Sequence, residues 1–162
     1  MMLTFTLSAA LASSAAAVPP PTEGDDRTAI LATVNALFDR LGATGEELAE
    51  FVAPEGVIFI HNEMDPENPK LIIRPNTILT DKTEASGAKL QERMGIPTVL
   101  QHGDMAHVWA PYAFWMNGEK THCGIDSLSL SRTEGTWRVT NMTYTVEPLE
   151  SCADLGAPEN PE

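Results

Sequence analysis

The dipeptide Asn117-Gly118 joins two long β-prone segments, HVWAPYAFWM (107–116) and EKTHCGIDSLSLS (119–131). Asn-Gly is the strongest short-range signal for a two-residue hairpin turn, because both positions accept a positive φ. A hairpin of this length predicts the middle of a sheet. It also contains His122, Cys123 and Asp126, which could form a metal site, a nucleophile with its base, or a strand whose neighbours face opposite ways.

The turn sets a register for the two strands. A two-residue turn predicts that Trp109 pairs with Asp126, with a bulge or an edge at Pro111, which has no N–H to donate. A second turn at 132–135 predicts a third strand, in which Asn141 pairs with Asp126.

Side chains of a strand alternate between the two faces of a sheet, so this register predicts two surfaces. One surface, with an apolar end and a polar end, carries Trp109, Trp115, His122, Asp126, Leu128, Leu130, Trp137, Val139, Asn141, Thr143 and Thr145. The opposite surface carries Tyr112, Phe114, Cys123, Ile125, Ser127, Ser129, Arg138, Thr140, Met142 and Tyr144. His122 and Cys123 are therefore back to back and cannot share one metal ion or act as base and nucleophile.

Two cysteines, Cys123 and Cys152, are present. An even number in an exported protein indicates a disulfide, whereas their spacing is not that of a zinc site. A bridge between them would hold the C-terminal segment against the sheet and stabilise the fold by roughly 3–4 kcal/mol.

The N-terminal segment predicts export. Residues 1–17, MMLTFTLSAALASSAAA, are uncharged, apolar to small, and end in an Ala-x-Ala pattern typical of signal peptide cleavage. Residues 18–24 form a Pro-rich leader. We therefore expect a secreted or periplasmic protein, and no transmembrane helix, since polar residues and prolines interrupt the stretch.

Helical patterns precede the strand patterns. Apolar spacing predicts a helix from Asp25 or Asp26 to Gly42, and Thr44-x-x-Glu47 is a capping-box pattern that opens a second. Strands are predicted at 56–62 and 70–74, an interrupted helix or two short ones at 76–94, and β-structure after Pro97. This order is typical of an α+β domain, here 25–152, followed by a disordered acidic tail at 153–162.

Charge excludes two classes of partner. The chain has 10 Lys and Arg against 23 Asp and Glu, a net charge of −13. Nucleic acids and anionic membrane surfaces require cationic patches, so neither is expected as a partner. No HxH, HExxH or paired-carboxylate spacing indicates a metal site, and no phosphate-binding loop or GxSxG elbow is present.

The element order, together with GDMAHVWAPYAFWMNGEKTHCGID and GTWRVTNMTYTVE, resembles the nuclear transport factor 2-like (NTF2-like) superfamily over about residues 25–147. The segments are most similar to its bacterial lumazine-binding-like and polyketide-cyclase-like branch. The resemblance implies a curved antiparallel sheet wrapped around N-terminal helices, a cone with a pocket at its open end. It also implies a possible homodimer, since members commonly pair through the outer sheet face.

The resemblance does not supply the function, because members include isomerases, dehydratases, epoxide hydrolases, cyclases and non-catalytic binding modules. Asp126 is the first candidate for a general base, with His122 four residues away on the same face, roughly 13 Å along a strand. The alternative is that Asp126 belongs to a structural polar network with Asn141.

Further candidates for ligand binding are His61, Arg74, Trp109, Trp115 and Asn141. Large aromatic side chains beside a few polar groups are typical of sites for small organic molecules. Each has a structural alternative: His61 as an exposed loop residue, Arg74 in a surface ion pair, and the tryptophans in packing. His102 and His107 are weaker candidates.

These observations favour an exported domain that binds a small organic molecule in a hydrophobic pocket, without catalysis, metal or cofactor. The alternative is a cofactor-free isomerase, cyclase or dehydratase with Asp126 as base and His122 or His61 assisting. No acid–base pair lies within bonding distance in the predicted register, which favours binding over catalysis.

Overall fold

The computed structural model describes residues 25–161 of the chain. The predicted signal peptide at 1–17 and the leader at 18–24 lie outside the described residues. Among residues 25–161, no helix is long and apolar enough to cross a membrane.

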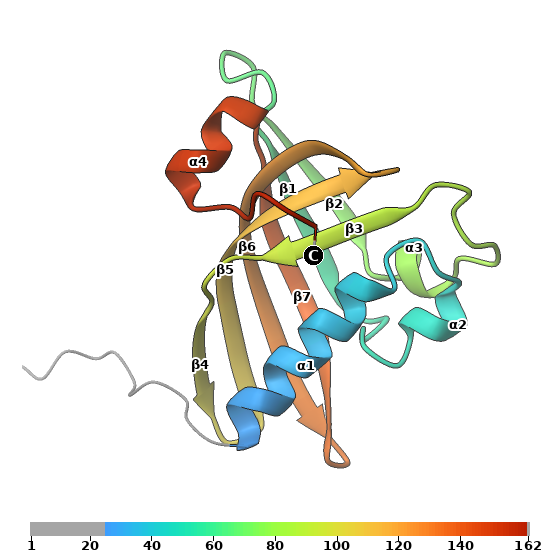
Figure 1. Cartoon of the computed structure of the whole chain (residues 1–162). Helices are drawn as coiled ribbons and strands as arrows, with labels where there is room; N and C mark the ends of the chain where they lie inside the picture. The colour runs from blue at the N-terminus through green and yellow to red at the C-terminus, as the bar shows by residue number, and fades with distance from the viewer. Residues whose placement is uncertain (1–24, 162) are drawn as a thin grey trace, which may run out of the picture.

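The architecture is α+β, as predicted (Figure 1). The elements, in chain order, are α1 (Asp25–Asp39), α2 (Gly45–Leu48), β1 (Val57–Asn62), β2 (Lys70–Pro75), α3 (Thr77–Thr80), β3 (Leu90–Met94), β4 (Thr98–His102), β5 (Met105–Met116), β6 (Glu119–Thr133), β7 (Thr136–Val146), a 3-10 turn (Leu149–Ser151) and α4 (Cys152–Leu155).

Seven strands form one curved sheet in the order β2-β1-β7-β6-β5-β3, and β4 also pairs with β5. The sheet is mixed rather than fully antiparallel, because β1 runs parallel to β7. We call the face that packs against α1 the inner face and the opposite face the outer face.

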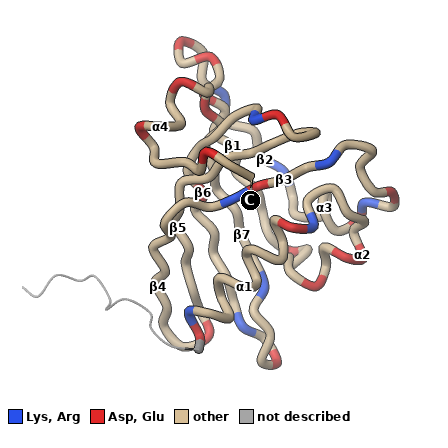
Figure 2. Tube along the Cα trace, in the orientation of Figure 1, with Lys and Arg blue, Asp and Glu red and all other residues tan. Residues whose placement is uncertain are grey.

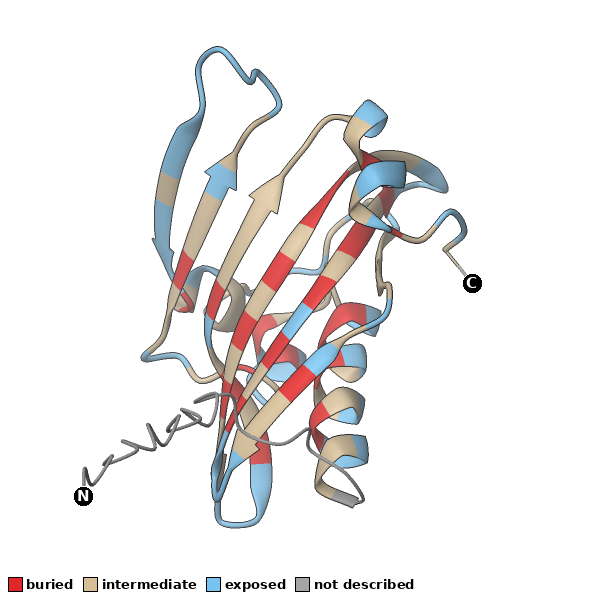
Figure 3. Ribbon diagram, turned by 90° about the vertical axis from the view of Figure 1, so that its left-hand side faces the viewer, coloured by how far each residue is buried: buried red, intermediate tan, exposed pale blue. Residues whose placement is uncertain are grey.

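The core lies between α1 and the inner face. Helix α1 buries Ile30, Val34 and Leu37, as its apolar spacing predicts, and they pack with Leu128 and Leu130 of β6. Figure 3 shows buried residues alternating with more exposed ones along the long strands. The apolar end of the predicted inner surface is therefore confirmed as core.

Residues 76–94 differ from the prediction of interrupted helix. Only Thr77–Thr80 is helical, and Leu90–Met94 is a strand that pairs antiparallel with β5. The residues LQERM favour a helix locally, but so short a segment after Ser86-Gly87 gains little from helical hydrogen bonds. Pairing with β5 instead gives the backbone groups of this segment hydrogen-bond partners. It also directs the Glu92 side chain toward the inner face of the sheet.

The β5–β6 hairpin has the predicted turn but not the predicted bulge. Asn117 and Gly118 have φ values of 54° and 87°, as the Asn-Gly turn requires. The register shifts between Phe114 and Trp115, opposite Thr121, and not at Pro111. Beyond this shift Ala110, and not Trp109, pairs with Asp126.

The β6–β7 register is also different. The turn is the dipeptide Glu134-Gly135, and a bulge between the pairs of Ser129 and Leu130 leaves Thr140 unpaired in the ladder. A bulge moves all later side chains of a strand to the other face. Tyr144, and not Asn141, therefore pairs with Asp126.

A buried asparagine holds this bulge. Asn76 is fully buried, and its Nδ2 donates to the carbonyl of Thr140 at 3.0 Å and to that of Ala53 at 2.7 Å. Asn141, next to the bulge, is exposed, and its Oδ1 accepts from the backbone N–H of Val57 at 3.0 Å. Three hydrogen bonds between these two side chains and neighbouring backbone groups thus fix the switch of faces in β7.

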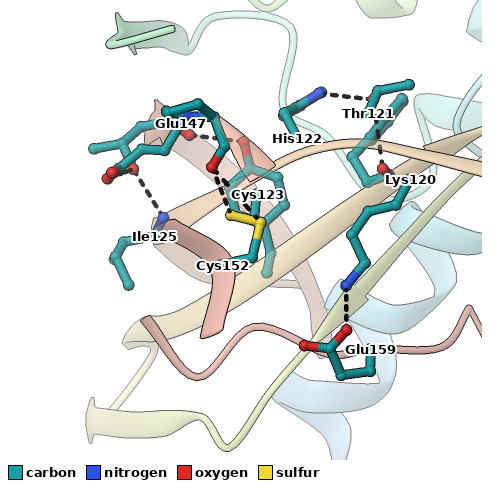
Figure 4. The surroundings of a disulfide bond; sticks show 12 residues. Lys120, Thr121, His122, Cys123, Ile125, Glu147, Cys152 and Glu159 are labelled. Atoms are coloured by element: carbon teal, nitrogen blue, oxygen red, sulfur yellow. Dashed lines mark hydrogen bonds and ion pairs between the residues drawn. A yellow bond between two sulfur atoms is a disulfide. The ribbon is translucent and has the colours of Figure 1, made fainter. Parts of the chain in front are cut away.

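The predicted disulfide between Cys123 and Cys152 is present (Figure 4). It holds the C-terminal segment on the outer face of β6, where α4 and the buried Ala157 pack. Lys120 Nζ pairs with Glu159 at 2.9 Å. Residues 153–161 therefore pack against the sheet, in contrast to the expected disordered tail.

Candidate functional site

A cavity of about 410 Å³ lies between α1, α3 and the inner face of the sheet. Most of its lining is apolar and comes from Leu37, Phe38, Leu41, Ile58, Ile60, Ile72, Ile78, Leu79, Phe114, Leu128, Met142 and Val146. Its polar lining residues are Asn62, Glu92, Tyr112, His122, Asp126 and Tyr144. Among the described residues, no Lys or Arg lines the cavity, so none of them places a fixed positive charge there.

Two carboxyl groups meet in this cavity. Asp126 is 3% exposed, and its carboxyl group interacts with that of the partly buried Glu92 of β3. No amide, alcohol, Lys or Arg donor of the described residues reaches the buried Oδ2 of Asp126. The Glu92 carboxyl group is therefore the neighbour that affects the ionisation of Asp126.

Burial changes the ionisation of the pair. Loss of solvation raises the pKa of Asp126 to about 7. Burial, followed by the charge of Asp126, raises the pKa of Glu92 well above its ordinary value. Two carboxylates so close together in an apolar site cannot both ionise cheaply, so the pair keeps at least one proton near neutral pH.

An aromatic wall continues from the carboxyl pair. The rings of Phe114 and His122 stack with centroids 4.9 Å apart, and Tyr112 meets His122 and Tyr144 edge-on at 5.9 Å and 6.2 Å. Tyr112 Oη donates to the carbonyl of Thr145 at 2.7 Å, which fixes its ring in place.

The ionisable groups of this wall are neutral near pH 7. Burial lowers the pKa of His122 and raises that of Tyr144 to about 12. His122 Nδ1 lies 2.9 Å from the hydroxyl of Thr121. The site therefore combines a carboxyl pair with neutral imidazole and phenol groups, a set that can donate and accept protons.

His122 and Asp126 thus both line the cavity, as predicted, and Figure 4 shows His122 and Cys123 pointing away from each other. The predicted register gave Asp126 no acid–base partner within bonding distance, whereas the structure places Glu92 of β3 in the same cavity and interacting with it. Glu92 was missed because its segment was interpreted as a helix. Read as a strand, alternation alone would have placed Leu90, Glu92 and Met94 on one face.

Three predicted binding residues lie elsewhere because the two bulges change the register. Trp109 lies on the outer face and is 51% exposed. Trp115 is 3% exposed and packs beside the disulfide and Ala157, under the C-terminal segment. Asn141 is outside the cavity. Tyr144, which lines the cavity, pairs with Asp126 at the position that the sequence predicted for Asn141.

The other predicted residues also lie outside the cavity. His61 is exposed and lines a small hollow with Glu63 and Lys70. Arg74 is exposed near the β2 edge, where its Nη1 donates to the carbonyl of Ile73. His102 and His107 line a separate hollow of about 400 Å³ on the outer face.

Among the described residues, no group of three His, Cys, Asp or Glu side chains is arranged to hold a metal ion. Acidic residues lie on loops and short helices around the sheet, and the few Lys and Arg are scattered (Figure 2).

Comparison with known proteins shows the fold. No family model matches the sequence, and no curated protein matches it. Solved structures do: an NTF2-like protein of unknown function from Silicibacter pomeroyi is similar at a TM-score of 0.52 and 17% identity, covering 75% of this chain and 95% of that one. The chain has an NTF2-like fold.

Two further similar structures are described by their roles. The β subunit of a protein assigned as an aromatic-ring-hydroxylating dioxygenase from Novosphingobium aromaticivorans has a TM-score of 0.56 and 16% identity over 76% of this chain and 90% of its own. The CaMKII hub homology domain of Chlamydomonas reinhardtii has a TM-score of 0.55 and 17% identity over 75% and 98%.

At these identities the NTF2-like neighbours define the fold and not the function. None of the three names the lumazine-binding-like or polyketide-cyclase-like branch, which stays a prediction. The structural features of this chain's own cavity are therefore the basis for a function.

Proposed function

We propose that this NTF2-like domain binds a small, largely apolar organic molecule in the cavity of about 410 Å³. The observation that carries this proposal is the pairing of the buried Asp126 with the partly buried Glu92 in a mostly apolar wall. Ligand sites typically combine an apolar cavity of roughly 300–1,000 Å³ with a few polar groups that orient the ligand.

The carboxyl groups of the cavity do not stabilise the fold at neutral pH. A buried carboxyl pair without a cation opposes folding at neutral pH, because both groups lose hydration. Tyr112 Oη donates its hydrogen bond to the Thr145 carbonyl, whereas no amide, alcohol, Lys or Arg of residues 25–161 donates to the buried Oδ2 of Asp126. A ligand group that bonds to the pair would recover part of the lost solvation.

A specific observation favours a second function, proton-transfer catalysis without a cofactor. General acid–base catalysts work best when their pKa lies near the working pH, and burial raises the pKa of Asp126 to about 7. Asp126 would accept a proton from the substrate while the protonated Glu92 donates one. An isomerase, cyclase or dehydratase reaction is consistent with this pair.

A thermal-shift screen of neutral, cationic and anionic aromatic and polycyclic compounds tests the binding proposal. Wild type should gain thermal stability with one or more of them, and Asp126→Ala should lose most of the gain. Ser127→Ala, one residue along β6 and facing outward, is the matched control and should behave as wild type. If no compound shifts either protein, the binding proposal is wrong.

Catalysis is tested separately from binding. Compounds that bind should be incubated with the protein in deuterated water and followed by NMR for proton exchange or conversion. Exchange that requires both Asp126 and Glu92, and is absent from Asp126→Asn and Glu92→Gln, would support the enzyme. Binding without exchange would support the non-catalytic function.

We also propose export and a homodimer. The Cys123–Cys152 disulfide is compatible with an oxidising compartment such as the periplasm or the extracellular space. Exposed apolar residues lie on the outer face at two separate places, Trp109 on β5 and Leu71 and Ile73 on the edge strand β2, where a second copy could pair. N-terminal sequencing of the exported protein and sedimentation velocity check the two proposals.

A further inference from the structure

We propose that the ligand of this cavity is a protonated amine on an apolar ring-sized frame, its ammonium group bound between the Glu92–Asp126 pair and the aromatic wall. This inference rests on the proposed binding function and adds the chemical class of the ligand.

The first argument is the sign of the charges that face the cavity. The ionisable lining groups are Glu92 of β3, Tyr112 of β5, His122 and Asp126 of β6, and Tyr144 of β7. Helix α1 contributes only the apolar side chains of Leu37 and Phe38, and the apolar Leu41 follows the helix. An anionic ligand would meet two carboxyl groups and no cation, whereas a cationic ligand would supply the counter-ion that the pair lacks.

The second argument is hydrogen bonding. The buried Oδ2 of Asp126 has no partner among the amides, alcohols and cationic side chains of the described residues. An ammonium group has three N–H donors and no acceptor, so it can satisfy both carboxyl groups at once. A ketone or an ether has no donor to offer, and an alcohol has only one.

The third argument is the aromatic wall. Phe114, His122, Tyr112 and Tyr144 form a continuous series of ring contacts along one side of the cavity. Faces of aromatic rings attract cations, most strongly where water is excluded. A carboxylate beside aromatic rings is thus a favourable environment for an ammonium ion and an unfavourable one for an anion.

Ionisation of the pair gives the proposal a distinctive pH dependence. The pKa of Asp126 is raised to about 7, mainly by burial, so an ammonium ligand competes with the proton held by the pair. Amine affinity should therefore rise as pH increases through about 7, whereas the affinity of a neutral ligand should not rise. The net charge of −13 also favours the approach of cations.

The test uses three probes of one shape on the full-length protein: 2-naphthylmethylamine, 2-naphthylmethanol and 2-naphthoate. Calorimetry at a pH slightly above 7 should show the amine binding at least about tenfold more tightly than the alcohol, with the carboxylate weakest. Asp126→Asn should reduce the preference of amine over alcohol, and the outward-facing Ser127→Ala should keep it.

The outcomes separate the two proposals. Equal or tighter binding of the alcohol, or an amine affinity that falls between pH 6 and pH 8, would overturn the amine inference while leaving ligand binding in place. Failure of all three probes, with no hit in the broader thermal-shift screen, would overturn both. The comparison of amine with alcohol on wild type needs no variant, so the inference stays testable even if Asp126→Asn does not fold.

Discussion

The two faces of β6 place adjacent residues in opposite environments. Asp126 faces the cavity, is almost fully buried and has its pKa raised by loss of solvation. Ser127, the next residue, faces outward, and its Oγ lies 3.4 Å from Nε2 of His107 on the outer face. The comparison teaches that the chemistry of this strand depends on the face to which a side chain points, and not on its neighbours in sequence.

The outer face is itself divided. Around Ser127 and Trp109 it is open, whereas around Cys123 and Trp115 it is covered by the C-terminal segment. The disulfide joins this cover to the strand covalently. The loss of unfolding free energy caused by a substitution should therefore differ most between the two faces in the middle of β6. It should differ least where the outer face is also buried.

The largest difference is expected between Leu128→Ala and Ser129→Ala. Leu128 is buried on the inner face, so truncation should cost about 2–5 kcal/mol of unfolding free energy through lost burial and a cavity. Ser129 faces outward, so its substitution by Ala should lower the unfolding free energy by less than about 0.5 kcal/mol. Urea unfolding measures both, and similar losses for the two variants would contradict the assignment of faces.

The disulfide should be the next largest contribution. Its cysteines are 29 residues apart, so its removal in Cys123→Ala/Cys152→Ala should cost roughly 3–4 kcal/mol in the loop-entropy model. Urea unfolding of oxidised and reduced wild type provides the matched comparison. Because Trp115 lies beside the bridge, its fluorescence should also change on reduction. An unchanged unfolding midpoint would mean that the C-terminal cover is held by other contacts.

The ionisation of the inner face should make stability depend on pH. The pKa of Asp126 rises from an ordinary 3.8 to about 7 on folding, so the folded state binds the proton more tightly. This stabilisation is fully present below about pH 4 and is lost as pH rises through about 7, by on the order of 2–4 kcal/mol.

Asp126→Asn should flatten this dependence, and Ser127→Ala should retain it. Unfolding free energies between pH 4 and pH 8, measured at high salt to screen the net negative charge, provide the check. Stability that rises over this range in wild type would show that Asp126 is not a desolvated carboxyl group.

A smaller loss is expected at the bulge that separates the faces of β7. Asn76→Ala removes two hydrogen bonds from a buried side chain to the carbonyls of Ala53 and Thr140, and should cost about 1–3 kcal/mol. Asn141→Ala removes one exposed hydrogen bond and should cost less. Chemical denaturation measures both, and a larger loss for Asn141 would argue against Asn76 as the residue that holds the bulge.

The smallest effect is expected for Trp109→Ser. Trp109 is half exposed on the outer face, so its loss should change the stability of the monomer by less than about 0.5 kcal/mol and should not change ligand affinity. Calorimetry with the best ligand, beside thermal melts, checks this. A large loss of ligand affinity would restore the original prediction that Trp109 belongs to the pocket.

Several features could be predicted from the sequence because their causes are local. The apolar spacing of α1 and the Asn117-Gly118 turn depend on residues close together in the chain. Strict alternation also places His122 and Cys123 on opposite faces, which left Cys123 free to pair with Cys152. The fold class followed from the order of these elements.

Only the tertiary structure decided which residues meet in the cavity. One bulge at Thr121 and one at Thr140 shift the register, and the second is held by Asn76, which is distant in sequence. They bring Phe114, Tyr112 and Tyr144 inward and leave Trp109 and Asn141 outside. Glu92 joins Asp126 because pairing with β5 overrides the local helical preference of its segment. The sequence by itself determined which residues alternate along each strand, and long-range pairing determined which of them face one another.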